Sequence, residues 1–247
     1  MYSDYLKALR AVCRKRHFSL VPIGHVKHRP LYKVALGKTK PLATVVFSAG
    51  IHGDEIAGPL AVLRFLEKIQ KRRLAGLRVL IIPVANPTGF DRGKRRNYQN
   101  RDINRHFAGK SLEGEPKILY NVLKAANPVF FHSLHEDVDE KRFYLYNYEQ
   151  QEEKVYRDVI ALAKRYFPVN TARKICNRPA RDGMVTNVRD KSLEYMMFRE
   201  GVPFVLCTES PGRQPLEKRI ELNYRIMQFV VRFAKRWGKQ FSERGRI

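Results

Sequence analysis

The segment His52-Gly53-Asp54-Glu55 places two metal-binding side chains at a defined spacing. It follows the apolar run at 44–47 and precedes an apolar pattern with helical spacing that begins at residue 56. Where a buried strand meets a helix, a histidine and a glutamate three residues apart can both reach one cation. Imidazole nitrogen and carboxylate oxygen together form a ligand set that suits zinc. Two ligands do not complete a site, so a third must come from a distant part of the chain.

Two histidines compete for the third ligand position. His132 and His135 lie three residues apart, and in an extended strand this spacing puts side chains on opposite faces. His132 lies inside an apolar run, whereas His135 stands at the end of that run beside Glu136 and Asp137. We therefore expect His135 to face the cation and His132 to pack in the core.

A candidate base and candidate anion-binding groups lie elsewhere in the chain. Glu209 follows the apolar run at 203–208 and precedes a Ser-Pro-Gly turn. A partly desolvated carboxylate beside a metal can act as a general base, although a surface turn residue would look the same. The long loop 86–105 is rich in arginine, and guanidinium groups bind carboxylates and stabilise oxyanions. Within it, Lys94, Arg96 and Arg101 could equally be solvated.

The elements that must position these residues alternate along the chain. Apolar runs at 43–48, 77–84, 129–134 and 203–208 are typical of strands covered on both faces. Helical patterns lie near 55–73, 113–126, 150–165, 191–200 and 216–238, which indicates an α/β sheet with helices on both faces. Residues 18–21 and 31–37 are expected to form antiparallel strands on one edge. Each candidate segment follows one of the four apolar strands, at the edge where such sheets bind ligands.

Length and composition limit the class of protein. No repeat or long linker divides the 247 residues, so we expect one domain over 1–247. No apolar run approaches the roughly 20 residues of a membrane span, and the N-terminus lacks a secretory-signal pattern. The three cysteines are widely spaced and odd in number, which argues against a disulfide framework. A cytoplasmic protein with reduced thiols is expected; the sequence does not indicate an oligomeric state.

The charge balance is strongly basic. Forty-eight Lys and Arg residues against 24 Asp and Glu residues give a formal net charge of +24. Such a field attracts anions, including nucleic acid and acidic peptides. The basic residues are spread along the chain, and we find no zinc finger, aromatic RNA-binding signature or basic zipper. We expect most of the excess charge to be solvated, with nucleic acid bound only through non-specific charge.

Taken together, these motifs resemble the zinc carboxypeptidase superfamily, which includes the succinylglutamate desuccinylase and aspartoacylase branch. Residues 52–55 match its His-x-x-Glu motif, and 86–89 resemble its Asn-Pro-x-Gly segment. Residues 95–97 followed by 102–105 resemble its Arg-x-Asn and Asp-x-Asn-Arg stretch. Residues 133–137, with 143–146 beyond them, resemble the family's strand that carries the third ligand. Residues 208–212 resemble its strand that carries the catalytic glutamate.

The resemblance implies a single-domain, three-layer α/β/α fold around a mixed sheet of roughly eight strands. It also implies roles for seven residues: one zinc ion held by His52, Glu55 and His135, Glu209 as the base, Arg95 at the oxyanion, and Asn104 with Arg105 on a substrate carboxylate. The chain departs from the pattern at Ser133, where an aspartate is common. Because Arg95 and Arg96 are adjacent, either could serve the oxyanion, and the spacing to Asp102 favours Arg95.

The reaction implied by the resemblance is hydrolysis of an amide bond next to a free carboxylate in a peptide, as in a metallocarboxypeptidase. The alternative is an N-acyl amino acid deacylase; that branch carries an added C-terminal β-domain, whereas the segment after Glu209 here reads as one helix. A third hypothesis, motivated by the charge, is a catalytically silent polyanion-binding protein. A full set of metal ligands with a base argues against it. The same charge suggests that acidic peptides could be the substrates.

Overall fold

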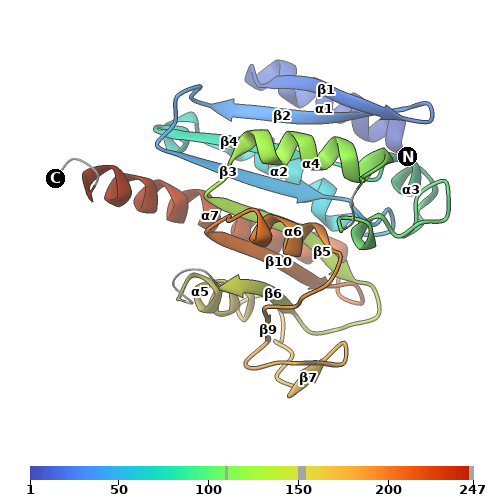
Figure 1. The fold of residues 1–247 in the computed structure, drawn as a ribbon, viewed down its shortest axis with the longest axis vertical. Helices are drawn as coiled ribbons and strands as arrows, with labels where there is room; N and C mark the ends of the chain where they lie inside the picture. The colour runs from blue at the N-terminus through green and yellow to red at the C-terminus, as the bar shows by residue number, and fades with distance from the viewer. Residues whose placement is uncertain (109–110, 150–153, 245–247) are drawn as a thin grey trace.

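One mixed sheet of eight strands organises the protein (Figure 1). The computed structural model describes residues 1–108, 111–149 and 154–244. The strand order is β1-β2-β4-β3-β5-β10-β6-β9, and a separate small hairpin pairs β7 with β8. The strands are β1 (Ser19–Val26), β2 (Arg29–Gly37), β3 (Ala43–Ala49), β4 (Leu77–Ile82), β5 (Phe130–Asp137), β6 (Tyr144–Glu149), β7 (Lys174–Ile175), β8 (Arg178–Pro179), β9 (Met184–Thr186) and β10 (Phe204–Pro211).

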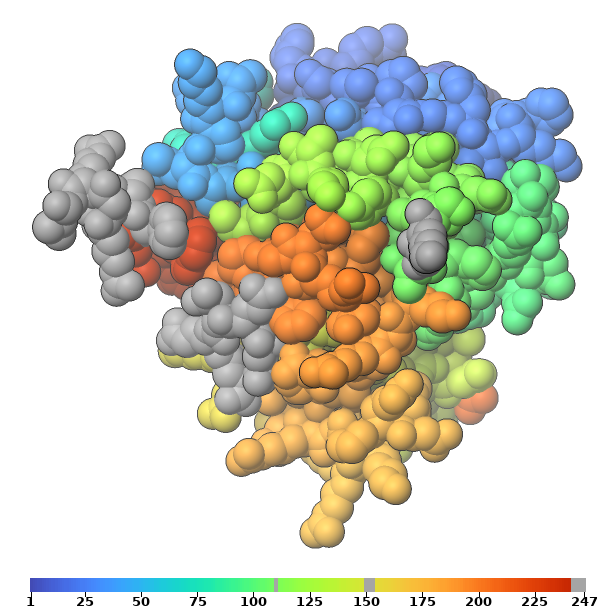
Figure 2. Space-filling model, in the orientation of Figure 1, coloured from blue at the N-terminus to red at the C-terminus, as the bar shows by residue number. Residues whose placement is uncertain are grey.

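Helices cover both faces of this sheet, and an apolar core lies between the sheet and the helices on each face. Residues of α1, α2, α5 and α7 pack in one buried cluster, and residues of α4 and α6 pack in another. Helices α4 and α6 lie side by side on the face seen in Figures 1 and 2, where Tyr120 donates a hydrogen bond to Glu200. The helices are α1 (Tyr2–Arg16), α2 (Ala57–Lys68), α3 (Pro87–Arg92), α4 (Gly114–Ala126), α5 (Lys154–Ala163), α6 (Leu193–Arg199) and α7 (Leu216–Arg244), with short 3-10 helices η1 (Lys71–Leu74) and η2 (Ile103–Arg105).

This arrangement confirms the expected three-layer α/β/α fold with a mixed, eight-stranded sheet. The four apolar runs form neighbouring parallel strands in the order β4-β3-β5-β10. Strands β1 and β2 pair antiparallel at one edge, as the sequence predicts. None of the helices in the described ranges combines the length and apolar character that a membrane span requires.

Several boundaries differ from the expectations. Strands β5 and β10 extend to Asp137 and Pro211, so His135 and Glu209 lie within strands rather than just past their ends. The reason is that backbone pairing between β5 and β10 continues through these polar residues, up to the Pro211–Asp137 pair. Helix α1 is an additional element that the sequence analysis does not predict. The predicted helix start at residue 150 lies outside the described residues.

Candidate active site

The parallel strands bring the candidate residues to one edge of the sheet. Strand β3 leads into the loop that carries His52 and Glu55, while β5 carries His135 and β10 carries Glu209. Glu209 pairs with His135 on one side and with Tyr144 of β6 on the other. Side chains of residues paired across neighbouring strands point to the same face of a sheet. The three side chains therefore share one side of the cleft.

The loop between β3 and α2 is held by close backbone contacts. Gly50 adopts a left-handed conformation with φ of 61°, and its carbonyl accepts a hydrogen bond of 2.9 Å from the Asn86 N–H. A Cβ atom at Gly53 would collide with the backbone of Gly89, so only glycine permits this approach. The Asn86 side chain caps α3 by accepting from the Gly89 N–H at 2.8 Å. The Asn-Pro-x-Gly segment thus acts as a scaffold for the loop that carries His52 and Glu55.

A second contact fixes the start of α2 against β5. The Glu136 carboxylate accepts a hydrogen bond of 2.6 Å from the Ala57 N–H at the first turn of α2. Its other oxygen pairs with Arg219 of α7. An acidic group at a helix N-terminus also interacts favourably with the helix dipole. Glu136, next to one predicted ligand, therefore holds the helix that follows the other two.

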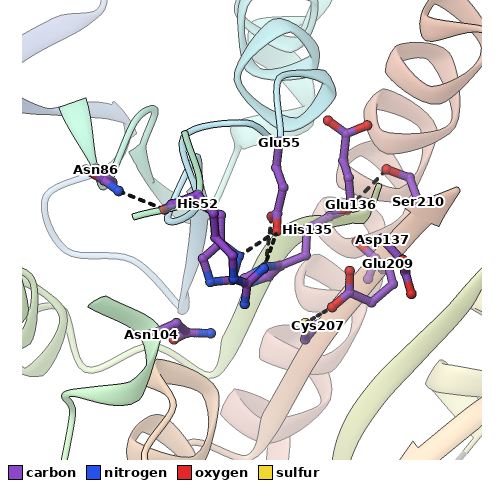
Figure 3. Close-up of polar contacts among 12 residues, drawn as sticks. His52, Glu55, Asn86, Asn104, His135, Glu136, Asp137, Cys207, Glu209 and Ser210 are labelled. Carbon is purple, nitrogen blue, oxygen red and sulfur yellow. Dashed lines mark hydrogen bonds and ion pairs between the residues drawn. The ribbon is translucent and has the colours of Figure 1, made fainter. Parts of the chain in front are cut away.

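His52, Glu55 and His135 converge, and Figure 3 shows the Glu55 carboxylate in contact with both imidazole rings. Nδ1 of His52 lies 2.5 Å from Oε1 of Glu55, and Nδ1 of His135 lies 2.9 Å from Oε2. The two imidazole rings are 5.0 Å apart between centroids. All three side chains are buried. The structure thus brings together the three side chains that the sequence predicts as ligands.

Each imidazole also faces a carboxylate through its other nitrogen. Nε2 of His52 lies 3.1 Å from Oδ1 of Asp102, and Nε2 of His135 lies 3.2 Å from Oε1 of Glu194. Carboxylates in this position fix the tautomer and orientation of metal-binding histidines. The sequence analysis assigned no role to either residue. Asp102 stands within the recognised Asp-x-Asn-Arg stretch, whereas nothing in the sequence around Glu194 marks it.

The carboxylates around the cluster stabilise positive charge at its centre, and the pKa values of its members are shifted accordingly. Burial disfavours the protonated form of His135, but the carboxylates of Glu55 and Glu194 outweigh it and raise the pKa of His135 well above its usual range. The pKa of His52 is also raised, because Glu55 and Asp102 outweigh burial. The two imidazoles in turn lower the pKa of Glu55 despite its burial. The carboxylates thus favour positive charge at the cluster.

The donor set fits a metal ion. One ligand atom from each of His52, Glu55 and His135 lies within 4.8 Å of the others. Oε2 of Glu55 is buried and has no hydrogen-bond partner of acceptable geometry among the described residues, although His135 Nδ1 is close. A buried acceptor without a donor is costly unless a cation satisfies it. Two imidazole nitrogens and a carboxylate oxygen match the protein ligands of catalytic zinc sites.

A second buried donor group shares one of these ligands. His135, Glu194 and Cys207 also offer ligand atoms within 4.8 Å of one another. Burial and the nearby Glu194 carboxylate raise the pKa of the Cys207 thiol well above its usual value. Because a metal binds the thiolate rather than the thiol, this group is the poorer site.

Glu209 has the properties of a group that exchanges protons. Its carboxylate lies on the same side of the cleft as His135, 4.0 Å from the Cys207 thiol (Figure 3). Desolvation and the neighbouring Glu55 charge raise the pKa of Glu209 to about 8, against the opposing effect of His135. A carboxyl group that titrates near neutral pH suits general acid and base catalysis.

The two adjacent arginines point in different directions. Arg95 lines the cleft, with Nη1 3.5 Å from Glu55 and Nη2 3.0 Å from Asp102. Its carbonyl oxygen accepts from the Asn86 side chain at 3.2 Å, so its backbone belongs to the loop scaffold. Arg96 instead donates to the carbonyl of Asn100 and does not line the cleft. Arg95 is therefore the arginine placed to reach a substrate in the cleft.

Asn104 and Arg105 line the same cleft, but they differ in how free their side chains are to bind a ligand. Asn104 is buried, donates to Glu194 at 3.1 Å and accepts from the Leu193 N–H at 2.9 Å. Arg105 is half exposed, and its Nη1 lies 3.7 Å from Asp190. The Asn104 side chain thus supports Glu194 and the first turn of α6, while the Arg105 guanidinium remains open to solvent and to a ligand.

The cleft itself has a volume of about 770 Å³. It runs from the His52, Glu55 and His135 cluster along β6, where Tyr144, Tyr146 and Tyr148 form one wall. The hydroxyl of Tyr144 donates to Asp137 at 2.8 Å, which fixes that part of the wall. Cys176 and Arg178 of the β7–β8 hairpin also line the cleft. This volume is at the upper part of the range for small-molecule sites.

His132 lies away from this cleft. Its ring is buried 5.7 Å from the ring of Phe47, and Nε2 lies 2.9 Å from the Thr208 hydroxyl. Burial lowers the pKa of His132 to about 3, so the imidazole is neutral at physiological pH. The structure therefore places His132 in the core and His135 at the cluster, as the strand periodicity predicts.

Comparison with known proteins points to the same chemistry. The model of the succinylglutamate desuccinylase/aspartoacylase catalytic domain matches residues 41–140. A solved structure described as a "putative metallopeptidase" from Shewanella amazonensis is 28% identical, with a TM-score of 0.88 over 94% of this chain and 92% of that chain. Among curated proteins, none matches.

Two more distant structures share the fold. A metallo-carboxypeptidase from Burkholderia cenocepacia has a TM-score of 0.73 at 19% identity, over 91% of this chain and 66% of that chain. A succinylglutamate desuccinylase from a Silicibacter species has a TM-score of 0.63 at 13% identity, over 88% and 66%.

These matches confirm the expected relationship and identify the kind of enzyme at a coarse level. The family model and the Shewanella structure support a hydrolase that is either metallopeptidase-like or succinylglutamate desuccinylase/aspartoacylase-like. Residues 41–140 are thus similar to the succinylglutamate desuccinylase/aspartoacylase catalytic domain, as the sequence motifs predict, and the chain as a whole is similar to a structure described as a putative metallopeptidase.

Proposed function

We propose that the protein is a zinc-dependent metallocarboxypeptidase-like hydrolase that cleaves an amide bond next to a free carboxylate in a peptide. The observation that carries this proposal is the convergence of His52, Glu55, His135 and Glu209 at one cleft of about 770 Å³. Zinc held by the two imidazoles and the Glu55 carboxylate would polarise the substrate carbonyl and lower the pKa of a water molecule toward about 7.

The side chains around the cluster supply proton transfer, stabilisation of the oxyanion and binding of the substrate carboxylate. Glu209 takes a proton from the attacking water and later delivers it to the leaving amine, which its pKa near neutrality permits. Arg95, which lines the cleft beside Glu55, stabilises the negative charge that develops on the carbonyl oxygen. Arg105, assisted by Asn104, binds the free carboxylate of the substrate and so determines which bond is cleaved.

A peptide fits the cleft better than a small N-acyl amino acid. The lining continues past the cluster along the three tyrosines to the β7–β8 hairpin, which leaves room on both sides of a scissile bond.

The N-acyl amino acid deacylase remains the second candidate, because the matching family model describes that branch. A preference for acidic substrates receives no support from the cleft itself. Its lining mixes Arg178 and Lys191 with Asp139 and Asp190. Any such preference would have to come from the charge of the whole protein.

One screen tests the proposal. Zinc-loaded wild type and Glu209→Gln are assayed against C-terminally free peptides, the same peptides with amidated C-termini, and N-acyl amino acids. We expect the wild type to release the C-terminal residue of free peptides only, and Glu209→Gln to bind zinc normally but lose roughly 100-fold or more of kcat. The exposed Glu217, changed to Gln, serves as the control.

Each other outcome has a defined meaning. Hydrolysis of N-acyl amino acids alone would replace the peptidase by the deacylase. Full activity of Glu209→Gln would remove Glu209 from the role of base. If the zinc-loaded wild type hydrolysed neither class, the proposed function would be wrong.

A further inference from the structure

A second cleft lies far from the candidate active site and is lined entirely by basic side chains. Its volume is about 460 Å³. The helix α7 runs from the active-site edge of the sheet back to the side where β3 begins, and its C-terminal half meets η1 there (Figure 1). The six side chains that line the cleft are Arg72, Arg73, Arg232, Lys235, Arg236 and Lys239; we refer to them as the basic cleft.

The fold builds this cleft from two segments that are distant in sequence. The four α7 positions recur at spacings of three and four residues, so their side chains occupy one face of the helix. Lys235 donates a hydrogen bond of 3.2 Å to the carbonyl of Arg72, which ties η1 to α7. Leu74 is buried beneath η1 and anchors that turn. The relative positions of the two arginine pairs are therefore set by the fold.

Five of the six side chains of the basic cleft have no carboxylate partner among the described residues. In the described part of the chain, no ion pair joins Arg72, Arg73, Arg232, Lys235 or Arg236 to a carboxylate. Partial burial, together with the charges of Arg73 and Arg236, lowers the pKa of Arg232. Clustered like charges repel one another, so this arrangement costs stability unless an anion binds to it.

We propose that the basic cleft binds a compact anion that carries several phosphate groups. Four of the six side chains are arginines, whose planar guanidinium groups bind phosphate oxygens through paired hydrogen bonds. The cleft is concave, so a compact ligand can contact η1 and α7 together. A free oligophosphate and the phosphates of a nucleic acid offer the same oxygen atoms. This role is independent of the hydrolytic site, because the two clefts share no lining residue.

The test uses inorganic tripolyphosphate as the probe and isothermal titration at fixed ionic strength. The double variant Arg232→Gln/Arg236→Gln removes two exposed charges from the cleft. The matched control Arg173→Gln/Lys174→Gln removes two exposed charges at the start of β7, and neither residue lines a cleft. We expect saturable binding by the wild type, a loss of about tenfold or more in affinity in the cleft variant, and less than about twofold in the control.

A parallel titration with a single-stranded oligonucleotide identifies the source of the phosphates. Tighter binding of the oligonucleotide, lost in the cleft variant alone, would assign a nucleic acid; tighter binding of tripolyphosphate would assign a free oligophosphate. The proposal would be overturned if the wild type bound neither probe saturably. Equal losses in the two double variants would also overturn it, because they would show that only net charge matters.

Discussion

Oε1 of Glu194 lies 3.2 Å from Nε2 of His135, and both side chains are almost completely buried. The second carboxylate oxygen accepts from Asn104 at 3.1 Å, and Asn104 is itself held by the Leu193 N–H. The carboxylate therefore cannot turn away from the ring. Because it fixes Nε2, it leaves Nδ1 directed at Glu55, which is the orientation that a metal at the cluster requires.

Replacing Glu194 with glutamine should weaken metal binding. A glutamine has only one oxygen, so it cannot accept hydrogen bonds from both Asn104 and the His135 ring. We expect zinc affinity to fall by roughly 10- to 100-fold, as is typical when such a partner of a metal-binding histidine is lost. Competition with a chromophoric chelator measures the affinity, and the absorption spectrum of the cobalt-substituted protein reports on ligand geometry.

Glu200, next to the same helix, provides the control. It contacts Lys124 and Tyr120 of α4 and does not line the active-site cleft. Glu200→Gln should leave the zinc affinity and the cobalt spectrum unchanged. Equal zinc affinity in Glu194→Gln and the wild type would show that Glu194 does not position His135.

The adjacent arginines should differ sharply in their effect on catalysis. Arg95 lines the cleft within 3.5 Å of Glu55, whereas Arg96 donates to a backbone carbonyl outside it. Arg95→Gln should lower kcat by about 100-fold or more, the usual cost of losing an oxyanion donor. Arg96→Gln should change kcat by less than about twofold. Steady-state kinetics on one hydrolysed peptide decide this, and the reverse order of effects would assign the oxyanion role to Arg96.

The framework of the fold could be predicted because its central strands are continuous apolar runs. Strands β3, β4, β5 and β10 are buried on both faces, and each leaves a plain signal in the sequence. Helix α1 was not predicted, although its buried residues recur at spacings of three and four, as in an amphipathic helix. The six-residue helix α3 is too short to show a period and depends on the Asn86 cap.

The site could be predicted only as far as its residues follow strand ends. His52, Glu55, His135 and Glu209 meet because neighbouring parallel strands end at one edge. Glu194 could not be found in this way. It lies 59 residues from His135 on a helix of the outer layer, and only packing brings it to the ring. Asp102 stood inside a recognised motif, but its contact with His52 depends on how the long loop folds back.

His132 should make stability depend on pH in a defined window. Burial lowers the pKa of His132 to about 3 in the folded protein, below its ordinary value of 6.5. Between these values the unfolded chain binds a proton that the folded protein does not, so the free energy of unfolding falls as the pH drops from about 6.5. The slope from one group is at most about 1.4 kcal/mol per pH unit.

Comparing variants isolates this contribution from that of the metal cluster. His132→Asn should unfold with a flatter dependence on pH between 6.5 and 4.5 than the wild type, measured by urea unfolding in the presence of a chelator. Replacing the exposed His28 with Asn should leave the wild-type slope. An unchanged slope in His132→Asn would show that the buried imidazole is not responsible.

Gly53 should be among the least replaceable residues of the site, for steric rather than conformational reasons. A Cβ atom there would collide with the Gly89 backbone, so Gly53→Ala must push apart the loop of His52 and Glu55 and the start of α3. Gly93 has a left-handed φ of 59° but open space around its missing Cβ. Gly93→Ala should therefore lower the free energy of unfolding by only about 1–2 kcal/mol, the strain of a left-handed alanine, and leave the zinc affinity unchanged. Gly53→Ala should lose both more stability and most of the zinc affinity. Zinc binding by Gly53→Ala at wild-type strength would show that the close approach of the two backbones is not needed to hold the ligands.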